Sequence, residues 1–155
     1  MATLILYKSR YGSTREYAEY LHQKIKNSDI RYMDDFDVNN FDSYEYIIIG
    51  SPTYAGQSEA YTYLINNWEH LKNKKIFVFT VGLIDPNNVI SQTFYHTIPE
   101  DIRKKIQYRK LPGKVDISRL NILEKLILNM MKVQNQDKLN LKDADPILRF
   151  VRIKI

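Results

Sequence analysis

The sequence predicts an α/β fold of three layers, in which a five-stranded parallel sheet has helices on both faces. Short apolar segments alternate with segments of helical periodicity along most of the chain. The strongest strand, residues 44–50, is apolar at almost every position, as expected where helices cover both sides of a sheet. The length of 155 residues suits a single domain over residues 1–155.

The first half of the chain predicts three strands and two helices. Residues 2–7 are apolar and β-prone, and a helix over 14–26 follows a polar, glycine-containing turn. A short second strand is expected over residues 31–33, and then an acidic loop. The third strand is the apolar run at 44–50. A loop over 51–56 and a helix over 59–71 complete this half.

The second half predicts two more strands, over 75–81 and 106–111, the latter ended by Pro112-Gly113. Between them we expect one or two short helices broken at Pro99. Residues 116–133 carry a broad apolar stripe typical of a helix, and residues 134–143 are polar and predict a loop. Asp145-Pro146 can start a final helix, because proline is tolerated at the first helical position. The alternation of residues 151–155 leaves a strand as the alternative there.

Alternating strands and helices predict a parallel sheet with right-handed crossovers, for which we take the doubly wound strand order 2-1-3-4-5. In that order the strands first and third in the sequence are neighbours. Ligands bind beyond the carboxyl ends of these two strands, where the order of connection reverses. The loops after the first and third strands are therefore the candidate binding loops.

The first candidate loop, Ser9 to Thr14, joins the first strand to the first helix. The first turn of a helix has unpaired N–H groups and partial positive charge, which attract an anion. Gly12 allows close backbone approach, and Ser9, Ser13 and Thr14 supply hydroxyl groups. The loop has neither the Gly-Lys-Thr of a P-loop ATPase nor the GxGxxG of a dinucleotide fold. It predicts a phosphate site, and an ordinary capped turn is the alternative.

These residues, together with the second loop, resemble the flavodoxin family. Ser9-Arg10-Tyr11-Gly12-Ser13-Thr14 matches the family's hydroxyl-x-x-Gly-x-Thr phosphate loop. Ser51-Pro52-Thr53-Tyr54-Ala55-Gly56 is similar to its Pro-Thr-aromatic flavin loop. The resemblance covers about residues 3–82 and implies a flavodoxin-like fold that binds FMN without a covalent bond.

The resemblance also implies a role for each loop. The first loop would hold the 5′-phosphate, and Thr53 would lie near the ribityl chain. Tyr54 would pack on the isoalloxazine ring, and a backbone carbonyl near Gly56 would meet flavin N5–H after reduction. A third loop, Val81-Gly82-Leu83-Ile84-Asp85, would line the pyrimidine edge with backbone donors, and Gly82 and Leu83 are its candidate site residues. Unlike many flavodoxins, the chain has no aromatic residue between positions 82 and 92, which would leave one flavin face open.

Charge is unevenly distributed along the chain. Residues 1–100 carry 9 basic and 12 acidic residues, whereas residues 101–155 carry 14 basic and 6 acidic residues, a net charge of +8. Familiar electron-carrier flavodoxins are acidic, so this chain departs from them. The basic segment is either a solvated surface or a docking face for an anionic partner or a membrane surface. Nucleic acid is not expected, because no helix-turn-helix or aromatic RNA-binding motif accompanies the charge.

Other features restrict the chemistry and the location. The absence of cysteine excludes disulfides, thiolate metal sites and cysteine nucleophiles. The three histidines are scattered, so we expect no metal site. The chain starts with no leader-like segment and has no apolar run long enough to span a membrane. We expect a cytoplasmic protein, with peripheral contact to a membrane left open.

A second resemblance concerns the C-terminal half. Tyr108-Arg109 with Pro112, followed by the basic, apolar segment around residues 120–131, is similar to the flavodoxin-type menaquinone-dependent protoporphyrinogen dehydrogenases. Three functions follow as hypotheses. The first is an FMN protein that exchanges electrons with a redox protein, a quinone or a small molecule. The second is oxidation of protoporphyrinogen with menaquinone as acceptor, and the third is a non-enzymatic interaction module.

Overall fold

The computed structural model describes residues 2–54, 57–82, 95–115, 122–123, 125–126, 136–137 and 139–151. Its strands are β1 (Thr3–Tyr7), β2 (Ser28–Tyr32), β3 (Tyr46–Tyr54), β4 (Gln57–Ser58), β5 (Lys75–Gly82), β6 (Ile106–Pro112), β7 (Lys114–Val115) and β8 (Gln136–Asp137). Its α-helices are α1 (Ser13–Lys24), α2 (Glu59–Asn66), α3 (Trp68–Leu71), α5 (Glu100–Arg103) and α7 (Asp145–Phe150). Short 3-10 helices are η1 (Met33–Asp35), η2 (Val38–Ser43) and η4 (Leu141–Ala144).

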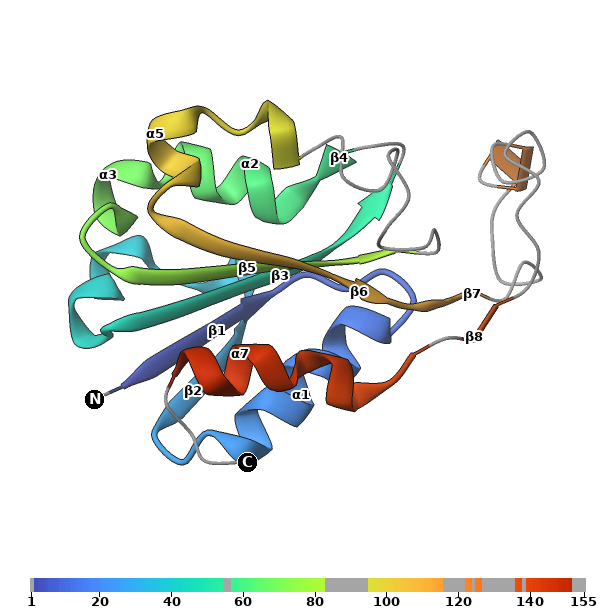
Figure 1. Cartoon of the computed structure of the whole chain (residues 1–155), viewed down its shortest axis with the longest axis horizontal. Helices are drawn as coiled ribbons and strands as arrows, with labels where there is room; N and C mark the ends of the chain where they lie inside the picture. The colour runs from blue at the N-terminus through green and yellow to red at the C-terminus, as the bar shows by residue number, and fades with distance from the viewer. Residues whose placement is uncertain are drawn as a thin grey trace.

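The main sheet has the order β2-β1-β3-β5-β6, and each neighbouring pair is parallel. This confirms the predicted order 2-1-3-4-5 of a three-layer flavodoxin-like fold. Figure 1 shows α1 and α7 on one face of the sheet and α2, α3 and α5 on the other. The short strand β4 pairs antiparallel with β3, and β7 and β8 form a separate ribbon.

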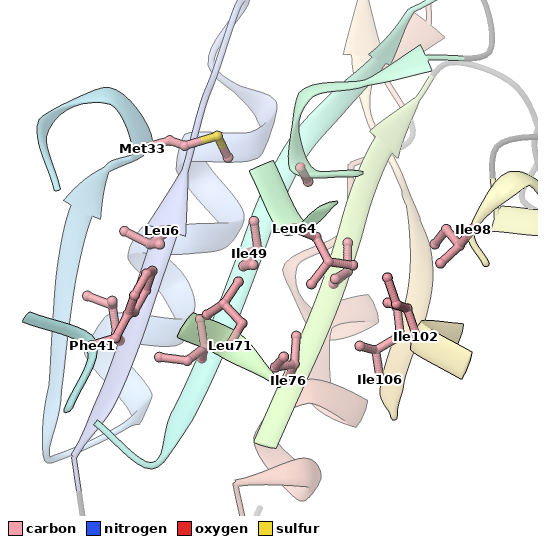
Figure 2. Close-up of a cluster of buried hydrophobic side chains, with 14 residues drawn as sticks. Leu6, Met33, Phe41, Ile49, Leu64, Leu71, Ile76, Ile98, Ile102 and Ile106 are labelled. Carbon is pink, nitrogen blue, oxygen red and sulfur yellow. The ribbon is translucent and has the colours of Figure 1, made fainter. Parts of the chain in front are cut away.

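Two apolar cores lie on the two faces of the sheet. The core beneath α2, α3 and α5 contains Leu6, Ile49 and Leu64, and Figure 2 shows how it extends from Phe41 to Ile106. The core beneath α1 and α7 is built on Ile5 and Phe79. The side chains of β1, β3 and β5 alternate between the two cores, which explains why their sequences are apolar at nearly every position.

The predicted loop over residues 51–56 is wrong at its start, because β3 continues to Tyr54. Ser51 and Pro52 pair with Thr80 and Val81 of β5, and Thr53 pairs with Ser58 of β4. The neighbouring strand on the other side, β1, ends opposite Gly50. Pro52 thus lies where one side of β3 is free, and a residue without an N–H group is tolerated there.

Three other boundaries differ from the sequence predictions. The second strand is Ser28–Tyr32 rather than 31–33, since an edge strand paired on one side needs few apolar residues to mark it. The helix expected over 59–71 is interrupted at Asn67, whose side-chain amide donates to the Tyr63 carbonyl at 2.9 Å. The acidic segment after β2 forms η1 and η2 rather than an open loop.

The structure of the C-terminal third also differs in part from the sequence predictions. Residues 134–143 were predicted as a loop, but β8 and η4 lie there; β8 depends on pairing with β7, which is distant in the sequence. The helix starting at Asp145-Pro146 is confirmed, with Val151 in a turn after it. The break at Pro99 is confirmed by the start of α5 directly after it. Most of the predicted helix over 116–133 lies outside the described residues, although 122–123 and 125–126 are helical.

Candidate functional site at the carboxyl edge of the sheet

The two predicted binding loops begin side by side. Tyr7, the last residue of β1, is the register partner of Gly50 in β3. The backbone N–H of Lys8 then donates to the Gly50 carbonyl at 2.9 Å, which holds the two chain segments together as they leave the sheet. The order of the sheet therefore brings residues about forty positions apart in the sequence to one edge.

The first loop is organised around the hydroxyl of Ser9. Its oxygen accepts the backbone N–H of Gly12 at 3.2 Å and that of Arg15 at 3.4 Å. Gly12 has a φ of 95°, a left-handed conformation that favours glycine, and a Cβ there would meet nothing within 4 Å. Arg10 is exposed, with its guanidinium carbon 5.8 Å from the ring centre of Tyr11.

The start of α1 presents unused donors at this loop. Among the described residues, the backbone N–H groups of Ser13 and Thr14 have no acceptor, and neither does the Thr14 hydroxyl. The Ser13 hydroxyl accepts the N–H of Lys114 at 3.2 Å and so connects α1 to β7. Free N–H groups at the N-terminus of a twelve-residue helix, beside a hydroxyl-rich loop, can hold an anion.

The side chains of the second candidate loop differ in how far they are buried. Ser51 is fully buried; its hydroxyl lies 2.8 Å from that of Ser58 and accepts the Ala60 N–H at 2.9 Å, which anchors the start of α2. Thr53 is only partly buried and donates to the Val81 carbonyl at 3.4 Å. Tyr54 ends β3. The predicted site residues Ala55, Gly56 and Leu83 lie outside the described residues, and their roles stay predictions.

Two lysines at this edge were not among the predicted site residues. Lys8 forms ion pairs with Asp34 at 3.2 Å and Glu59 at 3.5 Å, and the hydrogen bond to Asp34 raises its pKa. Lys110 is buried on β6 beside Gly82. Sequence position could have indicated Lys8, which follows a strand directly. Lys110 could have been noticed as a charged residue that follows Ile106 and Tyr108 at alternate positions, on the inward face of β6.

The end of β6 is attached to α1 by partly buried polar contacts. The hydroxyl of the fully buried Tyr17 donates to the Pro112 carbonyl and accepts the N–H of Asn140 at 3.4 Å. An ion pair of 3.1 Å between Lys114 and Glu16 lies nearby. These contacts place the ribbon of β7 and β8 next to the first loop, as Figure 1 shows.

We expect Tyr17→Phe to lower the free energy of unfolding by about 1–2 kcal/mol, because a partly buried carbonyl and a backbone N–H lose their hydrogen-bond partner while the buried ring is kept. Urea unfolding followed by circular dichroism measures this. Tyr20→Phe is the matched control, since its hydroxyl donates to Asp145 at 2.8 Å but the side chain is partly exposed. Equal losses in the two variants would contradict a special role for Tyr17.

Within the part of the chain that the structure describes, no helix has the length and apolar character needed to cross a lipid bilayer.

Comparison with known proteins agrees with this architecture. A search of curated protein sequences found no match. Among solved structures, the Trp repressor binding protein of Bacillus subtilis is similar, with a TM-score of 0.55 and 16% identity over 75% of this chain and 85% of that one. A flavodoxin from the domain Archaea has a TM-score of 0.54 and 16% identity over 85% and 97% of the two chains. Flavodoxin 2 of Bacillus cereus has a TM-score of 0.50 and 21% identity over 72% and 84%.

At these identities the solved structures establish the fold alone. A sequence model of the flavodoxin domain, however, matches residues 4–142, which run from β1 into η4 and include both candidate loops. Sequence and architecture thus agree over most of the chain, and the protein belongs to the flavodoxin family.

Proposed function

We propose that this protein binds FMN at the carboxyl edge of the sheet and transfers electrons through it. The observation that carries the proposal is the pairing of an anion-binding helix start with a second loop on the neighbouring strand. The donors at the first loop are two backbone N–H groups and the Thr14 hydroxyl, none of which has an acceptor among the described residues. These donors fit a phosphate.

The residues of this edge fit the rest of the cofactor as well. Gly12, with its left-handed φ and open surroundings, lets the loop backbone approach a ligand closely. The Thr53 hydroxyl lies at the end of β3, where it could contact the ribityl chain. FMN, when bound, supplies the electron-accepting and electron-donating chemistry, and the protein supplies binding, orientation and electrostatics.

We expect Ser9→Ala and Thr14→Ala each to raise the dissociation constant of FMN about tenfold, because each removes a hydroxyl from the phosphate loop. Quenching of flavin fluorescence on titration of apo-protein measures this. Riboflavin lacks the phosphate, so its affinity should change less than threefold in both variants. Thr62→Ala is the matched control, because that side chain is exposed on α2 and donates to the Ser58 carbonyl.

Two outcomes would count against the proposal. No FMN binding by the wild-type protein at micromolar concentration would refute it outright. Equal weakening of FMN and riboflavin by Thr14→Ala would contradict a phosphate contact, since the loss would then come from the structure of the loop. Tyr54→Ala tests the predicted stacking separately and should weaken both ligands.

A second candidate is oxidation of protoporphyrinogen with a quinone as acceptor. It is supported by apolar residues in the segment between β7 and β8, two strands whose ribbon lies beside the first loop. Ile122, Leu123 and Leu126 of that segment are exposed by 80%, 66% and 56%, and an apolar substrate or acceptor could contact them. The net charge of +8 over residues 101–155 suits the propionates of a porphyrinogen. Failure of FMN-loaded protein to oxidise protoporphyrinogen with a menaquinone analogue would refute this candidate.

A further inference from the structure

Lys110 is a buried cation at the same edge of the sheet. On β6 the side chains of Gln107 and Arg109 are exposed, whereas Ile106 and Lys110 are buried. Lys110 itself is only 9% exposed. Its side chain thus belongs to the face of the sheet covered by α2 and α5, as the core contacts of Ile106 indicate.

The side chain of Lys110 reaches across β5 at Gly82. A Cβ atom placed on Gly82 would lie 2.5 Å from Cε of Lys110, 2.7 Å from its Nζ and 2.6 Å from Oγ1 of Thr53. The ammonium group and the Thr53 hydroxyl therefore occupy the space that a side chain at position 82 would need. Since β5 lies between β3 and β6, Lys110 comes from one side of Gly82 and Thr53 from the other.

The side chains of Lys110 and Thr53 meet at the second and third candidate loops rather than at the first. Thr53 lies in the second loop predicted to meet the flavin, and Gly82 opens the third. The first loop leads into α1, which covers the opposite face of the sheet. Lys110 is thus placed towards the loops expected to hold the flavin ring rather than the one expected to hold the phosphate.

The charge of Lys110 is poorly compensated. Among the described residues it forms no ion pair with a carboxylate, and burial lowers its pKa to about 8. It still carries its proton at neutral pH. A buried and unpaired ammonium group costs folding free energy, and an apolar residue of the same length would remove that cost. Strongly shifted groups of this kind concentrate at functional sites.

We propose that Lys110 sets the reduction potential of the bound flavin, its ammonium group favouring the reduced, negatively charged form over the oxidised form. This inference rests on the FMN binding proposed above. Reduction adds negative charge to the flavin ring, and a cation that water does not screen stabilises that charge. The chain would in this way hold its flavin at a higher potential than a flavodoxin with acidic surroundings.

The test compares wild-type protein, Lys110→Met and Lys105→Met, each loaded with FMN. Spectroelectrochemical titration and FMN binding together give the ratio of the dissociation constants of reduced and oxidised flavin. We expect this ratio to rise at least tenfold in Lys110→Met, which equals a fall of about 30 mV in the two-electron potential. Lys105→Met removes the same charge from an exposed position before β6, about 16 Å along the strand, and should change the ratio less than twofold.

The outcomes separate this inference from the function on which it rests. If wild-type protein binds no FMN, both the proposed function and this inference are refuted. If wild-type protein binds FMN and Lys110→Met leaves the ratio unchanged, only the role of Lys110 is refuted. Equal weakening of both oxidation states with FMN, but not with riboflavin, would assign Lys110 to the phosphate and also refute it. Lys110→Gln, which keeps a polar end, serves as the second variant if Lys110→Met does not fold.

Discussion

Gly50→Ala is expected to lower the free energy of unfolding by about 3 kcal/mol, the upper end of the range for overpacked cores. Gly50 and Phe79 are register partners in β3 and β5, and both lie in the middle of the sheet. A Cβ on Gly50 would overlap three atoms of the Phe79 ring, well inside van der Waals contact. Phe79 is itself fully buried, so it cannot move aside without disturbing the core beneath α1. Chemical denaturation measures the loss.

The double variant Gly50→Ala/Phe79→Leu identifies the cause. A leucine at position 79 leaves room for the added methyl group. The loss of unfolding free energy in the double variant should therefore be smaller than the sum of the losses in Gly50→Ala and Phe79→Leu, by at least about 1 kcal/mol. Gly12→Ala provides a contrast, because a Cβ there meets nothing and only the left-handed φ opposes it. It should cost about 1 kcal/mol. Strict additivity in the double variant would show that the Phe79 ring is not the obstacle.

Replacing Lys110 by methionine is expected to stabilise the apo-protein by about 3 kcal/mol at pH 7, and this gain should shrink at high pH. Burial lowers the pKa of Lys110 from 10.5 to about 8, and each pKa unit corresponds to about 1.4 kcal/mol. Between pH 8 and 10.5 the unfolded chain binds this proton and the folded chain does not. Wild-type stability therefore rises with pH relative to the variant in this window. Below pH 8 the full cost is present, and above pH 10.5 it is absent.

Urea unfolding of both proteins from pH 7 to 10.5 tests this linkage. The comparison uses the difference between the two proteins because tyrosines also titrate at high pH. Burial raises the pKa of Tyr63 and Tyr108 to about 12, so their contribution to stability is lost as the pH rises above 10. That loss is common to both proteins and cancels in the difference. A difference that does not change with pH would mean that Lys110 keeps its proton throughout and is compensated.

The sequence by itself determined the strand order, the two apolar faces and the position of both candidate loops. It could do so because strands buried on both sides, such as β3 between Tyr46 and Gly50, are apolar at nearly every position and mark the centre of the sheet. The Gly12 turn before α1 is likewise a local property, since a left-handed φ and a helix start depend on neighbouring residues. The start of the final helix at Asp145-Pro146 is also set by the local sequence.

Only the tertiary structure decided features that depend on distant partners. The strand β3 extends to Tyr54 because β5 and β4 supply hydrogen-bond partners there, although the sequence of Ser51 to Tyr54 is that of a loop. Ser51 is polar like Ser9, yet its hydroxyl is used inside the protein at the start of α2. Lys110 is one cation among many in the basic C-terminal third, and its sequence neighbours do not distinguish it. It is buried beside Thr53 because Gly82, on the strand between them, has no side chain to keep the two apart.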